Sequence, residues 1–236
     1  RQGKTQTATI KRESVEIHDV PHYSMVDDEI GYLVLRKFGD KASQETITAV
    51  RALKNQGAKK LILDLRGNPG GLLTEAVNVT NIFVPQNQLV VTTKSKVEKY
   101  NKTYYTQKEP IDTDIPLIVL IDGKSASASE IVAGALQDLD RAVIVGTRSF
   151  GKGLVQRPKS LVYGTQIKIT ISRYYTPSGR CIQALDYWNR DESGKATRVA
   201  KENYNAFKTR RGRTVYDGGG IQPDIELEYS KLSPIT

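Results

Sequence analysis

The stretch K-S-A-S-A-S-E at residues 124–130 decides the fold, because it joins two segments of opposite character. The apolar run before it, residues 117–121, is typical of a buried strand. The run after it, residues 131–136, predicts the body of a helix. The small residues between them allow a sharp turn and a close approach by another molecule. Serines at the start of a helix most often only cap it, and this interpretation stays open here.

The same alternation of strand and helix continues along the chain in both directions. It implies a mostly parallel sheet covered by helices. We therefore predict an α/β fold of this type, with added antiparallel strands. Strands are expected at 31–35, 61–65, 117–121 and 142–145, an antiparallel hairpin at 89–93 and 97–105, a later antiparallel strand at 166–172, and helices at 43–56, 72–83 and 129–139.

A second stretch, G-K-G at 151–153, carries a lysine in an unusual place for a solvated surface charge. A serine hydroxyl is a poor nucleophile until a base takes its proton. A neutral lysine can be that base, and burial favours the neutral form because a low dielectric penalises the ammonium. Leu154 and Val155 can enclose the stem of Lys152. Gln156 can accept a hydrogen bond from the amine without adding a negative charge.

Four motifs, taken together, resemble those of the tail-specific or C-terminal processing serine peptidases. Each motif is weak alone, but four in the right order are specific, and the resemblance extends from about residue 10 onward. It implies a peptidase core of the crotonase/ClpP-like type. The motifs are S-A-S-A-S-E at 125–130, G-K-G at 151–153, D-L-R-G-N-P-G-G at 64–71 and T-P-S-G-R-C-I-Q at 176–183.

This resemblance implies a Ser-Lys dyad that needs no cofactor and no metal. Ser127 would be the nucleophile, and Lys152, 25 positions later, would be the base. Gln156, four positions further on, would orient the lysine. The family acts outside the cytoplasm on exported or membrane-attached proteins. We therefore expect a serine endopeptidase of the bacterial periplasm or cell envelope, which cuts a protein or peptide with a free C-terminus near that end through an acyl-enzyme.

Acyl transfer also needs N–H donors for the developing oxyanion. The backbone N–H of Ala128, next to the candidate nucleophile, is one candidate. The resemblance puts the other at Gly70 or Gly71, between which the sequence does not choose. The turn N-P-G-G at 68–71 is also explained as a tight turn alone, and both interpretations can hold.

Two other classes of function compete with the peptidase. The first is a catalytically silent peptide-binding or scaffold module on the same fold, against which the intact Ser127, Lys152 and Gln156 argue. The second is an acyl-CoA enzyme, because related helix-covered sheets serve that chemistry and a fold alone does not fix function. The absence of an acidic pair beside the glycine turn argues weakly against it.

The domain prediction separates residues 1–30 from a Ser-Lys peptidase core at 31–236. Loose alternation in residues 1–20 predicts one or two strands, and 21–30 predicts a loop. In the family a PDZ domain precedes the core, so we expect 1–30 to be strands and linker left from such a domain, in an excised fragment. The chain shows no Gly-Leu-Gly-Phe-like carboxylate loop. We therefore expect it to keep the chemistry but lose most recognition of the substrate's C-terminus.

Composition limits the possible partners. The 236 residues are 38% hydrophobic and carry a net charge of +9. Residues 189–213 hold eight Lys or Arg and three Asp or Glu, which suits either nucleic-acid binding or a solvated, mobile segment. We favour the second interpretation and predict no nucleic-acid partner, because regularly interleaved aromatic residues are absent. The apolar runs are too short to span a membrane, so membrane association would need parts outside this chain.

Three rival sites have little support. His18 and His22 lie far in sequence from the serine turn, and Pro21 between them disfavours a metal pair on a helix. The run G-x-x-x-x-G-K at 146–152 matches a phosphate-binding loop, but Gly153 stands where Ser or Thr should follow. Cys181 could be a thiol nucleophile, although no histidine lies nearby in sequence and a packing role is favoured.

Overall fold

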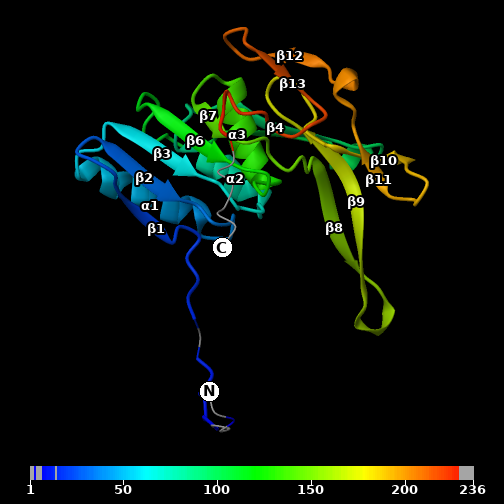
Figure 1. Ribbon diagram of the computed structural model, residues 1–236, viewed down its shortest axis with the longest axis horizontal. Helices are drawn as coiled ribbons and strands as arrows, with labels where there is room; N and C mark the ends of the chain where they lie inside the picture. Colours follow the sequence, from blue (N-terminus) through cyan, green and yellow to red (C-terminus); the bar gives the residue numbers. More distant parts are fainter. Residues whose placement is uncertain (1–2, 4–6, 14, 229–236) are drawn as a thin grey trace.

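The computed structural model describes residues 3, 7–13 and 15–228, and its centre is a six-stranded sheet (Figure 1). The strand order is β1-β2-β3-β6-β7-β14. All neighbouring pairs are parallel except β1 and β2, which pair antiparallel at one edge. The bounds are His22–Met25 for β1, Ile30–Val34 for β2, Lys60–Asp64 for β3, Leu117–Ile121 for β6, Val143–Gly146 for β7 and Ile225–Glu226 for β14.

Three helices accompany the parallel strands and cover apolar side chains. Helix α1 (Ala42–Asn55) connects β2 to β3, α2 (Leu73–Asn81) follows β3, and α3 (Ala128–Asp138) connects β6 to β7. Helix α3 contacts α2, β7 of the central sheet and β4 (Leu89–Lys94) of a second sheet. All 11 residues of α3 are buried, because the helix is enclosed by these elements. The helix that starts beside Ser127 is therefore part of the core.

The second sheet is antiparallel, with the order β5-β4-β9-β8. Strands β8 (Leu154–Ser160) and β9 (Gln166–Tyr175) form a long hairpin that extends away from the body of the molecule (Figure 1). The base of this hairpin joins the body, because β9 pairs with β4, which in turn pairs with β5 (Lys102–Tyr105). Short 3-10 turns lie at Glu98–Tyr100 (η1), Val162–Gly164 (η2) and Lys201–Asn203 (η3).

The basic segment at 189–213 contributes to two short antiparallel strand pairs. The prediction of a solvated, mobile segment did not include this regular structure. Strand β10 (Leu185–Arg190) pairs with β11 (Ala196–Arg198), and β12 (Ala206–Lys208) pairs with β13 (Thr214–Tyr216). The Arg213 guanidinium forms ion pairs with Asp140 and Asp224. Part of the positive charge of this segment is thus paired with carboxylates of the same fold.

The predicted α/β fold is confirmed. The four strands expected to share a sheet are β2, β3, β6 and β7, and they and the three helices lie within two residues of the predicted bounds. The predicted hairpin at 89–105 is present as β4 and β5, but β5 starts at Lys102 because Glu98–Tyr100 forms a 3-10 turn. Strand β9 continues to Tyr175 beyond its predicted end. The partner strand β8 was not predicted.

The N-terminal prediction is wrong in its details. Residues 7–13 and 15–20 contain no strand, and β1 lies inside the predicted loop at 21–30. Ile10 is 84% exposed and Val15 79% exposed, so these side chains have no sheet against which to pack. Residues 1–2, 4–6 and 14 lie outside the described residues. The origin of 1–30 in a PDZ domain stays a prediction. Within the described chain, no helix has the length and apolar character needed to cross a membrane.

Candidate active site

Two turns meet at the carboxyl edge of the central sheet. Strand β3 ends at Asp64 and leads into the glycine turn, and its parallel neighbour β6 ends at Ile121 and leads into the serine turn. The carbonyl of Asn68 joins the turns, because it accepts from the Ala126 N–H at 3.0 Å and from the Ser129 hydroxyl at 2.9 Å. Parallel pairing thus brings together two motifs that lie far apart in the sequence.

Ser127 stands where the serine turn becomes helix α3, and its backbone is strained. Its φ is 58° and its ψ is −111°. These are close to the angles of the first central residue in a type II′ turn, where glycine is usual. Holding a residue with a side chain in such a sparsely populated region costs about 1–3 kcal/mol. A serine on a strained strand-to-helix turn is also how α/β-hydrolases expose a nucleophile.

The three hydroxyls of the serine turn have different environments. Ser125 and Ser129 are fully buried, and their hydroxyls donate to the backbone carbonyls of Leu65 at 2.8 Å and Asn68 at 2.9 Å. These two serines hold the turns together. Ser127 is only half-buried, so its hydroxyl is the one that a substrate can reach.

The glycine turn packs directly against Ser127. A Cβ on Gly70 would lie 2.8 Å from Ser127 Cβ and 2.9 Å from the Ala128 nitrogen, so only glycine allows this approach. The Gly70 N–H donates to Asn68 Oδ1 at 2.9 Å. The N–H groups of Gly71 and Ala128 have no acceptor within the part of the chain that the structure describes. These two N–H groups are therefore available to a ligand, whereas that of Gly70 is occupied.

The buried carboxylate of Glu130 ties the serine turn to the G-K-G turn. Its Oε2 accepts from the Ser127 N–H at 2.8 Å and from the Lys152 N–H at 2.9 Å. Its Oε1 accepts from the Ser149 hydroxyl at 2.5 Å and from the Gly151 N–H at 2.7 Å. Because one oxygen atom serves both N–H groups, the backbones of Ser127 and Lys152 are held next to each other.

The environment of Glu130 suits a carboxylate that positions other groups. Burial raises the pKa of Glu130 above its ordinary value, and the hydrogen bonds from Ser149, Lys152, Ser127 and Gly151 offset only part of that rise. All four partners are donors, and an ionised carboxylate can accept from all of them without a proton of its own. Its oxygens thus accept from three backbone N–H groups and one serine hydroxyl of the protein rather than from a ligand.

Tyr174 is a second residue that touches both turns. Its hydroxyl donates to the carbonyl of Lys152, and it also has a hydrogen-bond interaction with the Ser127 side chain. Tyr174 is 2% exposed. Burial, together with the charge of Glu130, raises the pKa of Tyr174 well above its ordinary value. The phenol therefore stays protonated, and because its single proton goes to the Lys152 carbonyl, its oxygen can only accept from Ser127.

Lys152 and Gln156 lie at the start of the β8–β9 hairpin. Lys152 is half-buried between Gly151 and Gly153, as the motif suggested. Gln156 is exposed on β8, and its amide donates to Thr170 Oγ1 on β9 at 3.5 Å. The role of Gln156 in orienting the lysine thus stays a prediction.

The rival sites gain no support from the structure. Burial raises the pKa of Cys181, which disfavours the nucleophilic thiolate. His18 and His22 are exposed and lie near Glu45 and Ser24. The run at 146–152 leads into strand β8 rather than a helix, and two of its N–H groups are taken by a carboxylate. No three His, Cys, Asp or Glu side chains gather as a metal site among residues 3, 7–13 and 15–228.

Two residues of the site were missed by sequence reasoning. Glu130 could have been found, because S-x-x-E at 127–130 is the signature of a helix capping box, in which the glutamate reaches back to the N-cap N–H. Tyr174 carries no such local signal. Its position depends on the pairing of β9 with β4 and β8, which brings a distant segment to the site.

Comparison with known families identifies the chain's relatives. The model of peptidase family S41 matches residues 29–187, which contain the glycine turn, the serine turn and the G-K-G turn. The chain belongs to peptidase family S41. The predicted resemblance to C-terminal processing peptidases is thereby confirmed.

Named relatives of this S41 chain agree with the assignment. It is 37% identical to the carboxyl-terminal-processing protease of Picosynechococcus sp. over 184 residues, which are 76% of the chain and 43% of the relative. It is 39% identical to the carboxy-terminal-processing protease of Bartonella bacilliformis over 180 residues, 75% of the chain and 41% of the relative. The chain therefore spans less than half of the length of these relatives.

Solved structures show the same fold. The photosystem II D1 C-terminal processing protease is 28% identical and superimposes with a TM-score of 0.67, over 92% of this S41 chain and 50% of that chain. A putative S41 protease from Bacteroides fragilis is 18% identical with a TM-score of 0.65, over 91% of this chain and 52% of that one, and supports the fold alone.

Proposed function

We propose that this S41 chain is the catalytic core of a serine endopeptidase that works through Ser127 and Lys152. The observation that carries the proposal is the hydrogen bonding of both backbones to one oxygen of Glu130. The bridge formed by Tyr174 supports it, because the same phenol contacts the Ser127 side chain and the Lys152 carbonyl. Catalytic pairs need such rigid support, since small errors of position cost much of the rate.

In the proposed reaction, Ser127 Oγ attacks the carbonyl carbon of the scissile peptide while the neutral amine of Lys152 takes the hydroxyl proton. The C–N bond then breaks, the leaving amine receives that proton, and an acyl-enzyme remains on Ser127. Water attacks this ester with Lys152 again as base, and the product leaves as a carboxylic acid. Gln156 would direct the lysine amine, and in this structure its own amide donates to Thr170.

The oxyanion of each tetrahedral intermediate would be bound by the N–H groups of Ala128 and Gly71. Ala128 follows the nucleophile, and its N–H lies at the start of helix α3, where the helix dipole favours negative charge. Gly71 is preferred to Gly70, because the Gly70 N–H already donates to Asn68. The proposal therefore favours Gly71, whereas the sequence left the two glycines equivalent.

We further propose that the substrates are proteins cut near a free C-terminus in an extracytoplasmic compartment, the bacterial periplasm or cell envelope. The names of the relatives, carboxyl-terminal-processing proteases, support the first part. Residues 1–30 would be the end of a preceding PDZ domain in the longer protein.

The test is labelling with a fluorophosphonate serine probe, followed by mass spectrometric location of the adduct, together with peptide hydrolysis. The wild-type chain should be labelled at Ser127, and Ser127→Ala should not. Lys152→Ala should lower turnover by about 10²–10⁴-fold, the usual worth of a general base. Lys152→Arg should not restore it, because a guanidinium keeps its proton.

Lys124→Arg, at an exposed lysine in the same turn, is the matched control and should keep full activity. Labelling at another serine, or full activity in Lys152→Arg, would overturn the dyad. Peptide binding without labelling or hydrolysis would instead favour the silent binding module.

A further inference from the structure

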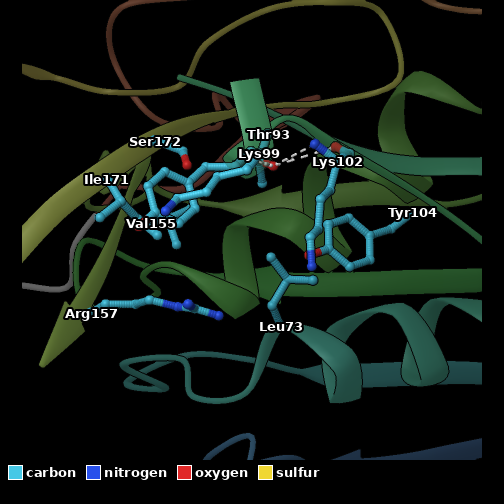
Figure 2. A pocket seen from close by; sticks show the side chains of 10 residues that line it. Leu73, Thr93, Lys99, Lys102, Tyr104, Val155, Arg157, Ile171 and Ser172 are labelled. Carbon is cyan, nitrogen blue, oxygen red and sulfur yellow. Dashed lines mark hydrogen bonds between the residues drawn. The ribbon is translucent and has the colours of Figure 1, made fainter. Parts of the chain in front are cut away.

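The hairpin of β8 and β9 has a base that belongs to the body of the molecule and an outer part that does not. At the base, Val155, Arg157 and Ile171 line a cavity of about 330 Å³, to which Leu73 of α2 also contributes (Figure 2). Residues 158–168, which we call the outer hairpin, are all exposed and project beyond the two sheets (Figure 1). The outer hairpin is therefore accessible to a partner outside the described chain.

Three consecutive large apolar or aromatic side chains stand at the tip of the outer hairpin. Leu161 is 49% exposed, Val162 73% and Tyr163 98%. Tyr163 has a φ of 58°, a left-handed conformation that residues with a side chain rarely adopt. The turn is held by hydrogen bonds, because the Leu161 N–H donates to the Thr165 carbonyl and the Thr165 hydroxyl to the Val162 carbonyl, both at 2.8 Å. An ordered turn thus presents an apolar surface to solvent, which is typical of an interaction site.

The charge of the hairpin has one sign. Residues 151–185 contain no Asp or Glu. Arg157, Lys159 and Lys168 take part in no ion pair within residues 3, 7–13 and 15–228. These cations therefore keep their charge for a partner, and an anionic surface is complementary to them.

The spacing between the apolar tip and the cations matches the two layers of a membrane surface. Lys159 precedes Leu161 by two residues, and Lys168 pairs with Pro158, three residues before Leu161. At about 3.4 Å per residue, these two lysines lie roughly 7–10 Å behind the tip. Apolar faces of membrane-surface elements enter the boundary between headgroups and acyl chains by about 5–10 Å. Tyrosine is enriched at that boundary. A tip inserted to this depth would place both lysines at the level of the lipid phosphates.

We propose that the outer hairpin binds the surface of a bilayer that contains anionic phospholipids. The three tip side chains enter the boundary between headgroups and acyl chains, and the two lysines pair with lipid phosphates. The inference goes beyond the proposed function, because it concerns binding and does not depend on Ser127 or Lys152. It departs from the expectation that membrane association would need parts outside this chain, since that expectation considered only segments long enough to span a bilayer.

The first experiment measures co-sedimentation of the chain with vesicles of phosphatidylcholine, with and without about 30% of the anionic lipid phosphatidylglycerol. The chain should bind the anionic vesicles, and Val162→Ser/Tyr163→Ser should weaken this binding about tenfold or more. Tyr23→Ser/Val26→Ser removes the same two side-chain types from exposed positions in and beside β1 and is the matched control, which should bind as the wild type does. Failure of the wild type to bind the anionic vesicles overturns the proposal.

The second set of variants tests the charge. Because each cation near an anionic surface contributes roughly fivefold to binding, Lys159→Gln/Lys168→Gln should weaken it about 20–30-fold. Salt at about 0.5 M should have a similar effect by screening. Lys195→Gln/Lys201→Gln, at exposed lysines of the basic segment 189–213, is the control and should change binding little. An equal loss in both double variants overturns the proposal, because net charge alone would then explain the binding.

The third experiment locates the part of the chain that enters the bilayer. Trp188 is the only tryptophan of the chain, so Trp188→Phe/Tyr163→Trp carries a single fluorophore at the tip. Anionic vesicles with brominated acyl chains should quench its emission. Trp188→Phe/Tyr23→Trp, with the fluorophore on β1, is the control and should stay unquenched. Bound protein with no quenching at the tip, or with equal quenching at both positions, overturns insertion of the outer hairpin.

Discussion

Glu130 accepts a hydrogen bond from the backbone N–H of Lys152, although the two residues lie 22 positions apart in the sequence. The glutamate belongs to the buried helix α3, and the lysine to the turn before the exposed β8–β9 hairpin. The backbone of the residue that we propose as the base is thus fixed to a fully buried helix. The start of an exposed hairpin is in this way held against the buried core by hydrogen bonds.

Glu130→Gln should impair both stability and labelling. The amide keeps the size of the carboxylate, but its NH₂ group would face N–H donors where an oxygen now accepts. Since hydrogen bonds to charged groups are worth about 1.5–3 kcal/mol each, we expect a loss of roughly 3 kcal/mol or more in the free energy of unfolding. Urea unfolding measures this loss. Glu75→Gln, at another buried carboxylate away from the site, should reduce stability while keeping probe labelling of Ser127. Normal labelling in Glu130→Gln would contradict the positioning role.

Asp64 should make stability depend on pH in the acid range. Burial alone would raise the pKa of Asp64, but hydrogen bonds from Arg66 and Tyr32 outweigh it and lower the pKa below its ordinary value. The unfolded chain therefore binds a proton at about pH 4, where folded Asp64 is still ionised. Its stabilising contribution is present above that pH and is lost as the pH falls through the folded value.

Urea unfolding at a series of pH values between about 7 and 2 checks this. The free energy of unfolding should fall more steeply below about pH 4 for the wild type than for Asp64→Asn, and Tyr32→Phe should give an intermediate slope. Parallel curves for the wild type and Asp64→Asn would show that Asp64 is not responsible.

The ion pair of Arg180 and Asp138 is fully buried, with an N–O distance of 2.8 Å. Arg180 also donates to Gln137 Oε1 at 2.7 Å. Arg180→Met should cost about 3–5 kcal/mol, because it leaves the Asp138 charge without its partner. Adding Asp138→Asn should restore part of that loss, since the neutral amide can still accept from the Ser178 N–H. If the double variant is less stable than Arg180→Met, the unpaired charge of Asp138 is not the cause of the stability loss in Arg180→Met.

Gly151 should tolerate no side chain beside Ala184. A Cβ at Gly151 would lie 2.3 Å from Ala184 Cβ, and its φ of +87° is unfavourable for an L side chain. We therefore expect Gly151→Ala to destabilise the fold and to reduce labelling of Ser127. Adding Ala184→Gly removes the contact but not the backbone strain, so thermal unfolding should show a partial rescue that stops about 1–2 kcal/mol short of the wild type. If Ala184→Gly restores no stability to Gly151→Ala, the contact between these two Cβ atoms is not the cause of the loss.

Patterns within single segments predicted most of the fold. Apolar runs such as 117–121 and helical periodicity in 43–56 depend only on neighbouring residues, so they are visible in the sequence. Strand β8 was not visible, because Leu154–Ser160 contains basic residues and a proline and leaves most of its side chains exposed. Strand β1 was hidden for a similar reason, since it lies at an edge and is exposed in its first half.

The parts of the candidate site that lie within one local motif were predictable from the sequence. The parts that depend on contacts between distant segments were not. The serine turn and the G-K-G turn were found, but their connection through Glu130 needs the packing of α3 against the segment before β8. The proposed preference for the Gly71 N–H over the Gly70 N–H depends on one hydrogen bond to Asn68, which the sequence does not show.

Ser127 occupies a backbone conformation that glycine adopts without conflict. Ser127→Gly should therefore unfold at higher denaturant than Ser127→Ala, with a difference of about 1 kcal/mol, while both lack the nucleophile. If variants of this chain were selected only for thermal stability, the selection would thus tend to replace Ser127. Under the proposed function, the serine at this position keeps the nucleophile at a cost in stability, so engineering for robustness must hold it fixed.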